Sequence, residues 1–178
     1  MRAVRQRRPD LELLVNNVSP DACGAAAAAG FATHCGDATT IDGRHETVVV
    51  SDALYYVPEL AACWAALQRL VKPGGWLVLR IPNRSLAIQA TLRLRPNEPL
   101  RVDLPAYNPE HLYLFTRPYL RRRLSAAGFT RVQVLGSPFV GTSRANALAF
   151  RLLGPLALTS SVLVLAQASP VRGHRHHA

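Results

Sequence analysis

The sequence is poor in the features that make disulfide frameworks, zinc sites and membrane spans. It has three cysteines, Cys23, Cys35 and Cys63, and no two stand at the short spacing of a zinc-binding pair. They suit a reducing compartment better than a disulfide framework. The longest apolar run, residues 152–168, is interrupted by a glycine, a proline and hydroxyl side chains, and it is short for a membrane span. We therefore expect no metal site and no stable membrane span.

Lysine is almost absent. Lys72 is the only one, so 20 of the 21 basic side chains are arginines, and with 11 acidic residues the formal net charge is +10. Such an excess can indicate nucleic acid or an anionic surface as a partner. A base-composition bias of the gene, which also favours alanine, explains it as well, and we prefer this explanation to a nucleic-acid partner.

The overall composition is that of a folded protein. Hydrophobic residues make up 49% and charged residues 18%, and a length of 178 residues predicts one domain with a sizeable core. The basic residues 1–10 are not followed by an apolar core of signal-peptide length. We therefore expect a cytoplasmic protein.

Residues 46–83 are the most informative stretch. A short apolar run ends at Ser51 and Asp52, a helical pattern covers residues 59–71, and a second apolar run covers residues 76–83. Two aliphatic strands joined by one helix predict a β-α-β unit with parallel strands. Because the runs are continuous rather than alternating, we expect helices on both faces of the sheet.

The turn at residues 71–77, Val-Lys-Pro-Gly-Gly-Trp-Leu, suggests a family. Its proline cannot continue the helix, and its glycines accept positive φ at the helix end. Together with Glu-Thr-Val-Val-Val-Ser-Asp at residues 46–52, it resembles strand four, the following helix and strand five of the class I S-adenosylmethionine-dependent methyltransferases. The resemblance implies a Rossmann-like α/β sheet, S-adenosylmethionine as cofactor and methyl transfer as the reaction.

The resemblance extends toward the N-terminus. Residues 11–15 are predicted to form a strand that is followed by an alanine-rich helix, and residues 31–37 a second strand. In the family, the loops after these strands hold the ribose and the adenine of the cofactor, so the resemblance assigns Asn17, Asp37 and Ala38 to cofactor binding. Asparagine lacks the charge of the usual acidic residue, which weakens its hydrogen bond to a ribose hydroxyl. Simple turn and capping roles are the alternatives for Asn17 and Asp37.

The residues after strand four are expected near the methionine end of the cofactor or the substrate mouth. The resemblance assigns Ser51 and Asp52 to the cofactor. Tyr55 and His111 are the candidate catalytic residues, His111 in a Pro-Glu-His-Leu stretch that many small-molecule members share. A tyrosine hydroxyl can orient a substrate but is a poor base near neutral pH. The alternatives are a packed aromatic for Tyr56 and a structural role for the histidine.

We predict that residues 1–168 form one partial methyltransferase domain. Its proline- and arginine-rich insert, residues 84–110, is expected to cover the substrate, and residues 169–178 to form a disordered tail. Residues 130–135 and 161–166 are predicted strands, and the resemblance implies that the second inserts antiparallel beside the first.

A glycine-rich loop is also lacking. Members of the family begin with a central strand that ends in an acidic residue and the loop Gly-x-Gly-x-Gly, whereas Gly24, Gly30, Gly36 and Gly43 stand alone here. We therefore expect the first strand and its loop to be missing, and S-adenosylmethionine to bind weakly. The edges of the two flanking strands would then be open to self-association.

The sequence favours methyl transfer to a small-molecule acceptor, which rests on proximity and orientation and requires no fixed triad. One alternative is a non-catalytic remnant that acts as a binding module, which the missing loop and Asn17 favour. The other is an RNA-associated methyltransferase, which only the arginines favour.

Overall fold

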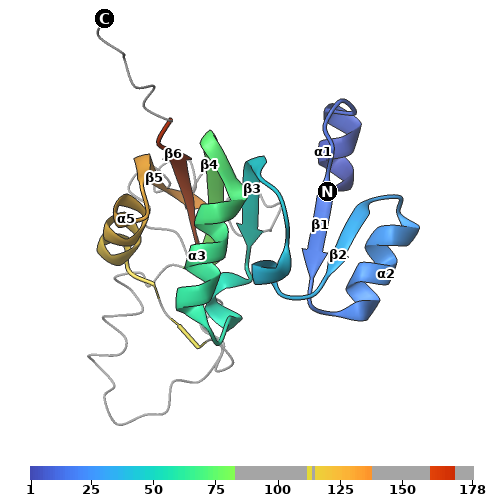
Figure 1. Cartoon of the computed structure of the whole chain (residues 1–178), viewed down its shortest axis with the longest axis horizontal. Coiled ribbons are helices and arrows are strands. Elements are labelled where there is room, and N and C mark those ends of the chain that lie inside the picture. The colour runs from blue at the N-terminus through green and yellow to red at the C-terminus, as the bar shows by residue number, and fades with distance from the viewer. Residues whose placement is uncertain (83–111, 114, 138–160, 171–178) are drawn as a thin grey trace, which may run out of the picture.

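The computed structural model describes residues 1–82, 112, 113, 115–137 and 161–170. These residues form a parallel two-stranded sheet, β1-β2, and a four-stranded sheet of order β3-β4-β6-β5. Figure 1 shows the two sheets side by side, with β1 on the side of β3 and both strands pointing the same way. The two strands are not paired with each other, and no described strand pairs with both of them.

The smaller sheet and its helices come first in the chain. The elements are α1 (Arg2–Arg7), β1 (Leu14–Asn17), α2 (Pro20–Ala28), β2 (Ala32–Cys35) and the 3-10 helix η1 (Ala38–Thr40). Ser19 caps α2 by accepting a hydrogen bond from the backbone N–H of Ala22 (3.4 Å), and Gly30 ends it with a φ of +78°. Arg5 of α1 donates to the carbonyls of Ala29 and Gly30 at 3.0 and 2.8 Å, which attaches α1 to the end of α2.

The position of β1 corrects the prediction. The strand covers Leu14–Asn17 rather than residues 11–15, so Asn16 and Asn17 lie in the strand and not after it. Asn17 pairs with Cys35 of β2, and the Asn16 side-chain amide donates to the carbonyl of Gly36 at 2.8 Å. These bonds join residues far apart in the sequence, and they outweigh the poor strand propensity of asparagine.

The predicted β-α-β unit is confirmed. It consists of β3 (His45–Ser51), the 3-10 helix η2 (Leu54–Tyr56), α3 (Leu60–Leu70) and β4 (Val71–Pro82), with β3 and β4 parallel. The Lys-Pro-Gly-Gly turn lies inside β4 as an irregularity between the pairs His45–Val71 and Thr47–Trp76. A Cβ at Gly75 would lie 2.7 Å from the carbonyl oxygen of Glu46, so only glycine lets the strands approach this closely.

The last described elements complete the larger sheet. They are α5 (Arg117–Ala126), β5 (Phe129–Ser137) and β6 (Ser161–Ala168). Thr116 caps α5 by accepting from the N–H of Tyr119 at 3.4 Å, and β6 lies antiparallel between β4 and β5, as predicted. Pairing continues past the strand, because the N–H of Ser169 donates to the carbonyl of Gly128 (3.1 Å).

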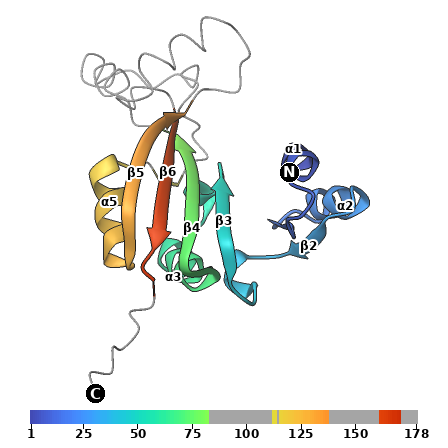
Figure 2. The same ribbon diagram turned by 90° about the horizontal axis from the view of Figure 1, so that it is seen from above.

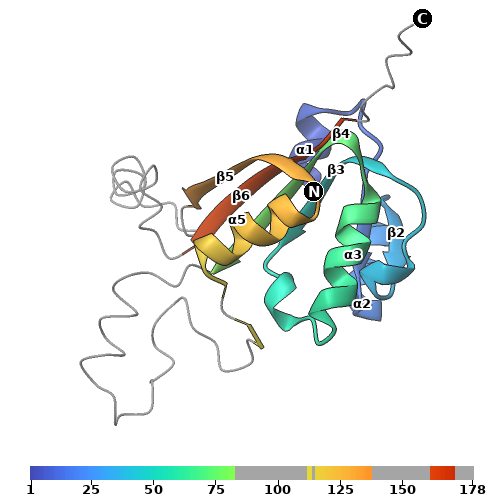
Figure 3. The same ribbon diagram turned by 60° about the vertical axis from the view of Figure 1, so that its left-hand side comes forward.

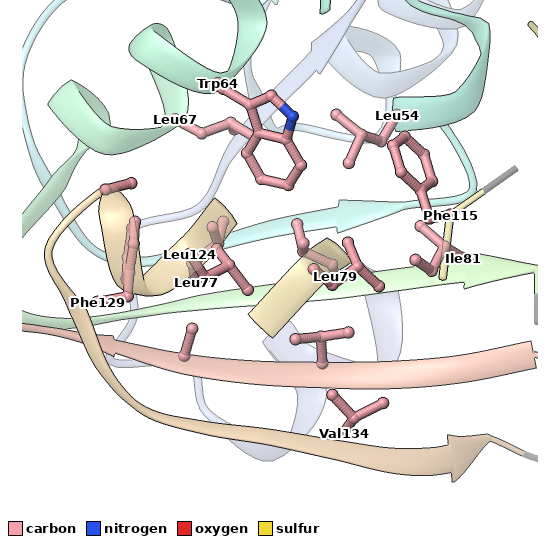
Figure 4. Packing of buried hydrophobic residues seen from close by; sticks show 14 of the residues in the cluster. Leu54, Trp64, Leu67, Leu77, Leu79, Ile81, Phe115, Leu124, Phe129 and Val134 are labelled. Atoms are coloured by element: carbon pink, nitrogen blue, oxygen red, sulfur yellow. The ribbon is translucent and has the colours of Figure 1, made fainter. Parts of the chain in front are cut away.

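The core lies between the four-stranded sheet and helices α3 and α5. Figures 2 and 3 show the two helices against this sheet, and Figure 4 shows the side chains that pack between them. Leu77, Leu79 and Ile81 of β4 are fully buried against Trp64 of α3 and Leu124 of α5. Each such aliphatic side chain stabilises the fold by about 1.5–3 kcal/mol.

The opposite face of this sheet is covered less completely. The β4 side chains that point away from α3 and α5, Trp76 and Val78, are half-buried, and Val49 of β3 is 63% exposed. We expected helices on both faces of the sheet. Among the described residues, helices pack closely on only one face of the larger sheet.

Candidate functional site

The candidate cofactor residues follow the ends of three strands. β1 ends at Asn17, β2 runs parallel to it and is followed by Asp37, and β3 ends at Ser51. The N–H of Gly36 donates to the carbonyl of Asn17 at 3.0 Å, so Asn17 and Asp37 lie at neighbouring strand ends. In open α/β sheets, ligands bind at the carboxyl ends of the strands, which is where these residues lie.

Asp37 caps η1 and carries an ionised carboxylate. Its Oδ1 accepts a hydrogen bond from the N–H of Thr39 at 2.7 Å, and the Asp37 carbonyl accepts from the Thr40 hydroxyl at 2.8 Å. The bonds from the Thr39 backbone and side chain hold the pKa of Asp37 below its usual value. The capping role is thus present, and the exposed carboxylate remains charged at neutral pH. Its contact with the cofactor, and that of the adjacent Ala38, stay predictions.

Asn17 has a local role too. Its Oδ1 accepts from the N–H of Ser19 at 2.9 Å, which forms a turn between β1 and α2. The side-chain carbonyl is therefore shared with the backbone, and the ribose contact of Asn17 stays a prediction. Its main-chain carbonyl also accepts from the thiol of Cys23 at 3.2 Å, so α2 is attached directly to the end of β1.

Asp52 stands in an unusual backbone conformation at the end of β3. Its φ of +54° lies in the left-handed region, which non-glycine residues rarely adopt. Its N–H donates to the carbonyl of Arg80 at 3.0 Å, and its Oδ2 accepts from the Ser51 hydroxyl at 3.1 Å and from Nη1 of Arg80. Ser51 and Arg80 are paired across β3 and β4. Two bonds thus hold the carboxylate and one holds the backbone of Asp52, at the mouth of the expected site.

Arg80 is the residue that the sequence analysis missed. Its side chain is 22% exposed and that of Asp52 is 35% exposed, so the ion pair is shielded partly from water. The only signal in the sequence was one arginine in an otherwise apolar strand. The pairing became visible only with the register of β3 and β4, because the two residues are far apart in the chain.

Tyr55 is buried in the core. It is 6% exposed, and its ring centroid lies 4.5 Å from that of Tyr56. Burial, and then the negative charge of Asp52, raise the pKa of Tyr55 to about 12. Its hydroxyl therefore stays protonated across the ordinary pH range and can donate a hydrogen bond, whereas Tyr56, considered as a packed aromatic, is 40% exposed. A catalytic role for Tyr55 stays a prediction.

The segment before α5 is attached to this region. The N–H of Leu112 donates to the carbonyl of Tyr55 at 2.9 Å, and the Tyr113 hydroxyl donates to the carbonyl of Pro58 at 2.9 Å. His111, the insert at 84–110 and residues 171–178 lie outside the described residues, so the predictions made for them remain open.

The described part of the chain offers neither a metal-ligand cluster nor a membrane-spanning helix. It contains no cluster of three histidine, cysteine or acidic side chains that could hold a metal ion. Nor does any helix in this part have the length and apolar character needed to cross a membrane.

The fold is similar to those of solved methyltransferases. An S-adenosylmethionine-dependent methyltransferase from Archaeoglobus fulgidus has a TM-score of 0.62 at 14% identity, with 93% of this chain and 79% of that chain covered. The magnesium protoporphyrin IX methyltransferase ChlM from Synechocystis PCC 6803, solved with bound SAH, has a TM-score of 0.58 at 15% identity. The match covers 88% of this chain and 64% of that chain. A Thermotoga maritima methyltransferase named as a possible histamine N-methyltransferase has a TM-score of 0.61 at 14% identity, with 86% of this chain and 72% of that chain covered. At these identities the similarity shows the fold alone.

The sequence itself also identifies the family. No curated protein matches the chain. A family model described as a methyltransferase domain matches residues 14–134, which is more than half of the chain and runs from β1 through most of β5. The chain therefore belongs to the methyltransferase-domain family, with the fold and the cofactor, S-adenosylmethionine, of the class I methyltransferases.

Proposed function

We propose that this protein transfers the methyl group of S-adenosylmethionine to a small-molecule acceptor, with the cofactor lying across the carboxyl ends of β1, β2 and β3. One observation carries the proposal. Asn17 ends β1, Asp37 and Asp52 come just after β2 and β3, and Figure 1 shows these strands of the two sheets pointing the same way. A ligand that contacts all three must span the ends of the strands, which is the usual place for a nucleoside in an open α/β sheet.

The side chains present fit part of this cofactor. The ionised carboxylate of Asp37 can accept a hydrogen bond from the exocyclic amine of adenine, while Asn17 can bond a ribose hydroxyl. Asp52 and Ser51 are at the end of β3, where the charged methionine portion would lie. The bound cofactor supplies an electrophilic methyl group on its sulfonium, and the residues of the chain hold this group in line with the acceptor.

The proton of the acceptor has to leave by another route than Tyr55. A phenol with a pKa of about 12 is protonated near neutral pH and cannot take up a proton there. Tyr55 can orient an acceptor by donating a hydrogen bond. His111 remains the proposed base or donor.

A small-molecule acceptor is supported by the names of two similar structures. ChlM and the Thermotoga maritima protein are named for magnesium protoporphyrin IX and histamine, both small molecules. The excess of arginine favours an RNA-associated methyltransferase as the second candidate. Among the described residues, no strand pairs with both β1 and β3 and so joins the two sheets. We therefore propose that this chain binds the cofactor weakly, and a non-catalytic binding module is the third candidate.

A transfer assay separates the three candidates. The chain is incubated with methyl-labelled S-adenosylmethionine at millimolar concentration and, separately, with a small-molecule cell extract, total RNA and total protein. We expect label in the small-molecule pool, less label with Asp37→Ala, and unchanged label with the exposed control Arg121→Met. Label in RNA instead would support the second candidate, and no label in any pool would support the third.

A further inference from the structure

Two cysteines from different elements meet beside the candidate site. Cys23 of α2 is buried, and its Sγ lies 3.2 Å from the carbonyl oxygen of Asn17 and 4.0 Å from that of His34. Cys35 follows His34 at the end of β2 and stands opposite Asn17 in the pairing of β1 with β2. Cys23 Sγ therefore lies beside the carbonyl groups of the two residues that flank Cys35 in space, Asn17 opposite it and His34 before it, and both thiols are free.

The two thiols have different environments. Cys35 is exposed at the end of the strand, so a dissolved oxidant can reach its sulfur, whereas Cys23 is buried and only 6% exposed. The neighbouring Cys35 thiol, and then burial, raise the pKa of Cys23. Cys23 therefore keeps its proton while the exposed thiol of Cys35 is the one that an oxidant attacks.

We propose that Cys23 and Cys35 form a dithiol–disulfide site that is oxidised by hydroperoxides. The Cys35 thiolate attacks the terminal peroxide oxygen, the O–O bond breaks, and the products are a sulfenic acid at Cys35 and an alcohol, or water from hydrogen peroxide. The Cys23 sulfur then attacks the sulfenic sulfur, the S–S bond forms, and water leaves with the Cys23 proton. Two thiols lose two electrons in total, and one peroxide gains them.

The disulfide would change the end of the sheet that faces the cofactor. It replaces the hydrogen bond from Cys23 to the Asn17 carbonyl, and it attaches α2 to the residue that precedes Gly36 and Asp37. We expect oxidation to alter S-adenosylmethionine binding by severalfold. This consequence rests on the proposed function, whereas formation of the disulfide does not.

Peptide mapping tests the chemistry directly. The reduced full chain is treated with hydrogen peroxide, free thiols are alkylated, and the protein is digested. Trypsin leaves Cys23 and Cys35 in one peptide and Cys63 in another, and cleavage by chymotrypsin after Phe31 then separates the two. We expect the free thiols to fall from three to one, with Cys23 and Cys35 linked within one chain and restored by dithiothreitol.

Cys63 provides the matched control. It is buried in α3, and burial raises the pKa of Cys63. Its thiol should therefore escape oxidation and be recovered in the alkylated form at every peroxide dose. In Cys23→Ser, oxidation of Cys35 should stop at a sulfenic acid that dimedone traps. In Cys35→Ser, which removes the exposed thiol, Cys23 should not be oxidised. The proposal is wrong if wild-type Cys35 accumulates as sulfenic acid beside a free Cys23, if Cys35 links two chains, or if no thiol of the pair reacts before Cys63.

A second readout separates the site from its consequence. Binding of S-adenosylhomocysteine is measured by NMR titration of the reduced and the oxidised chain. A disulfide that forms and changes the binding supports both steps, and one that forms without changing it keeps the dithiol site and removes its link to the cofactor. If neither form binds the nucleoside while the disulfide forms, the proposed function fails and the dithiol site stands.

Discussion

At the scale of the residue, the left-handed backbone of Asp52 is where the chain departs most from ordinary geometry beside the candidate site. Non-glycine residues in this region cost about 1 kcal/mol or more, and they persist where the surroundings hold them. Here the surroundings are the carbonyl and guanidinium of Arg80 together with the Ser51 hydroxyl. We therefore propose a positioning role for Arg80, because it holds the carboxylate of Asp52 through direct contact at the end of β3.

Replacing Arg80 tests this role. Arg80→Met keeps the length of the side chain and leaves the Asp52 carboxylate without its cation. Because the pair is only partly shielded, we expect the free energy of unfolding to fall by about 1–3 kcal/mol in urea denaturation. Arg121→Met on the exposed side of α5 should stay within about 0.5 kcal/mol of wild type. Equal effects of the two substitutions would argue against a positioning role.

Asp37 predicts a pH dependence. Its pKa is lower in the folded chain than its ordinary value near 3.8, so its contribution to stability is complete above that value and is lost as the pH falls through the lower folded pKa. Asp37→Ala should therefore destabilise the chain by about 1 kcal/mol at pH 7, as expected for loss of a cap.

The contribution of the charge is isolated by measuring the thermal unfolding of wild type and Asp37→Ala as a function of pH. The difference between wild type and Asp37→Ala should begin to shrink below about pH 4, where the carboxylate of the unfolded chain becomes protonated, and should vanish as the pH falls through the lower pKa of the folded chain. A difference that is constant from pH 7 to pH 3 would show that the charge of the cap makes no contribution.

At the scale of the element, the turn at the start of β4 depends on its glycine. A Cβ at Gly75 would lie 2.7 Å from the carbonyl oxygen of Glu46 and 2.9 Å from that of Lys72, both of them backbone atoms that cannot move aside easily. By contrast, a Cβ at Gly24 in α2 would meet nothing within 4 Å. The two glycines therefore have opposite roles, one steric and one dispensable.

Alanine at the two positions should change stability in opposite directions. We expect Gly75→Ala to lower the free energy of unfolding by about 2 kcal/mol or more, and Gly24→Ala to raise it by about 0.5–1 kcal/mol through better helix propensity. Chemical denaturation of both variants gives the comparison. A stabilising Gly75→Ala would mean that β3 and β4 do not pair as closely here as the structure shows.

Helices and strands could be predicted because their signals are local in the sequence. Contacts between residues far apart in the chain could not be predicted from it. The β-α-β unit at residues 46–83 was predicted from its apolar runs and its helical pattern, and caps such as Ser19 and Thr116 are equally local, because each bonds a backbone N–H three residues away. Asn16 in a strand and the bond of Arg80 with Asp52 were missed, because both depend on strand register. The meeting of Cys23 with Cys35 was missed for a related reason, since it depends on how α2 packs against β2.

At the scale of the whole molecule, the described chain forms two sheets whose neighbouring edges are unpaired. The edge strands β1 and β3 carry exposed apolar side chains, among them Leu14 at 39% and Val49 at 63%. Strand edges of this kind present backbone donors and acceptors that another chain can pair with. We therefore propose that this chain self-associates through these edges.

Sedimentation velocity tests the association. The sedimentation coefficient should rise with protein concentration, and Val49→Lys should reduce this rise because a charged side chain on an edge strand opposes pairing. Val4→Lys, at a position in α1 that is 42% exposed, is the control and should leave the rise unchanged. A wild-type coefficient that does not change with concentration would argue against association through the open edges.

The central claim is that S-adenosylmethionine binds at the carboxyl ends of β1, β2 and β3. The most direct measurement is an NMR titration of the ¹⁵N-labelled chain with S-adenosylhomocysteine, which reports position and affinity together. We predict shifts concentrated at Asn17, Asp37, Ser51 and Asp52, with a Kd much weaker than about 1 µM, the value that corresponds to roughly −8 kcal/mol. Shifts at the opposite end of the strands, or no shifts at millimolar ligand, would contradict the site, and micromolar affinity would contradict the weak binding proposed for this chain.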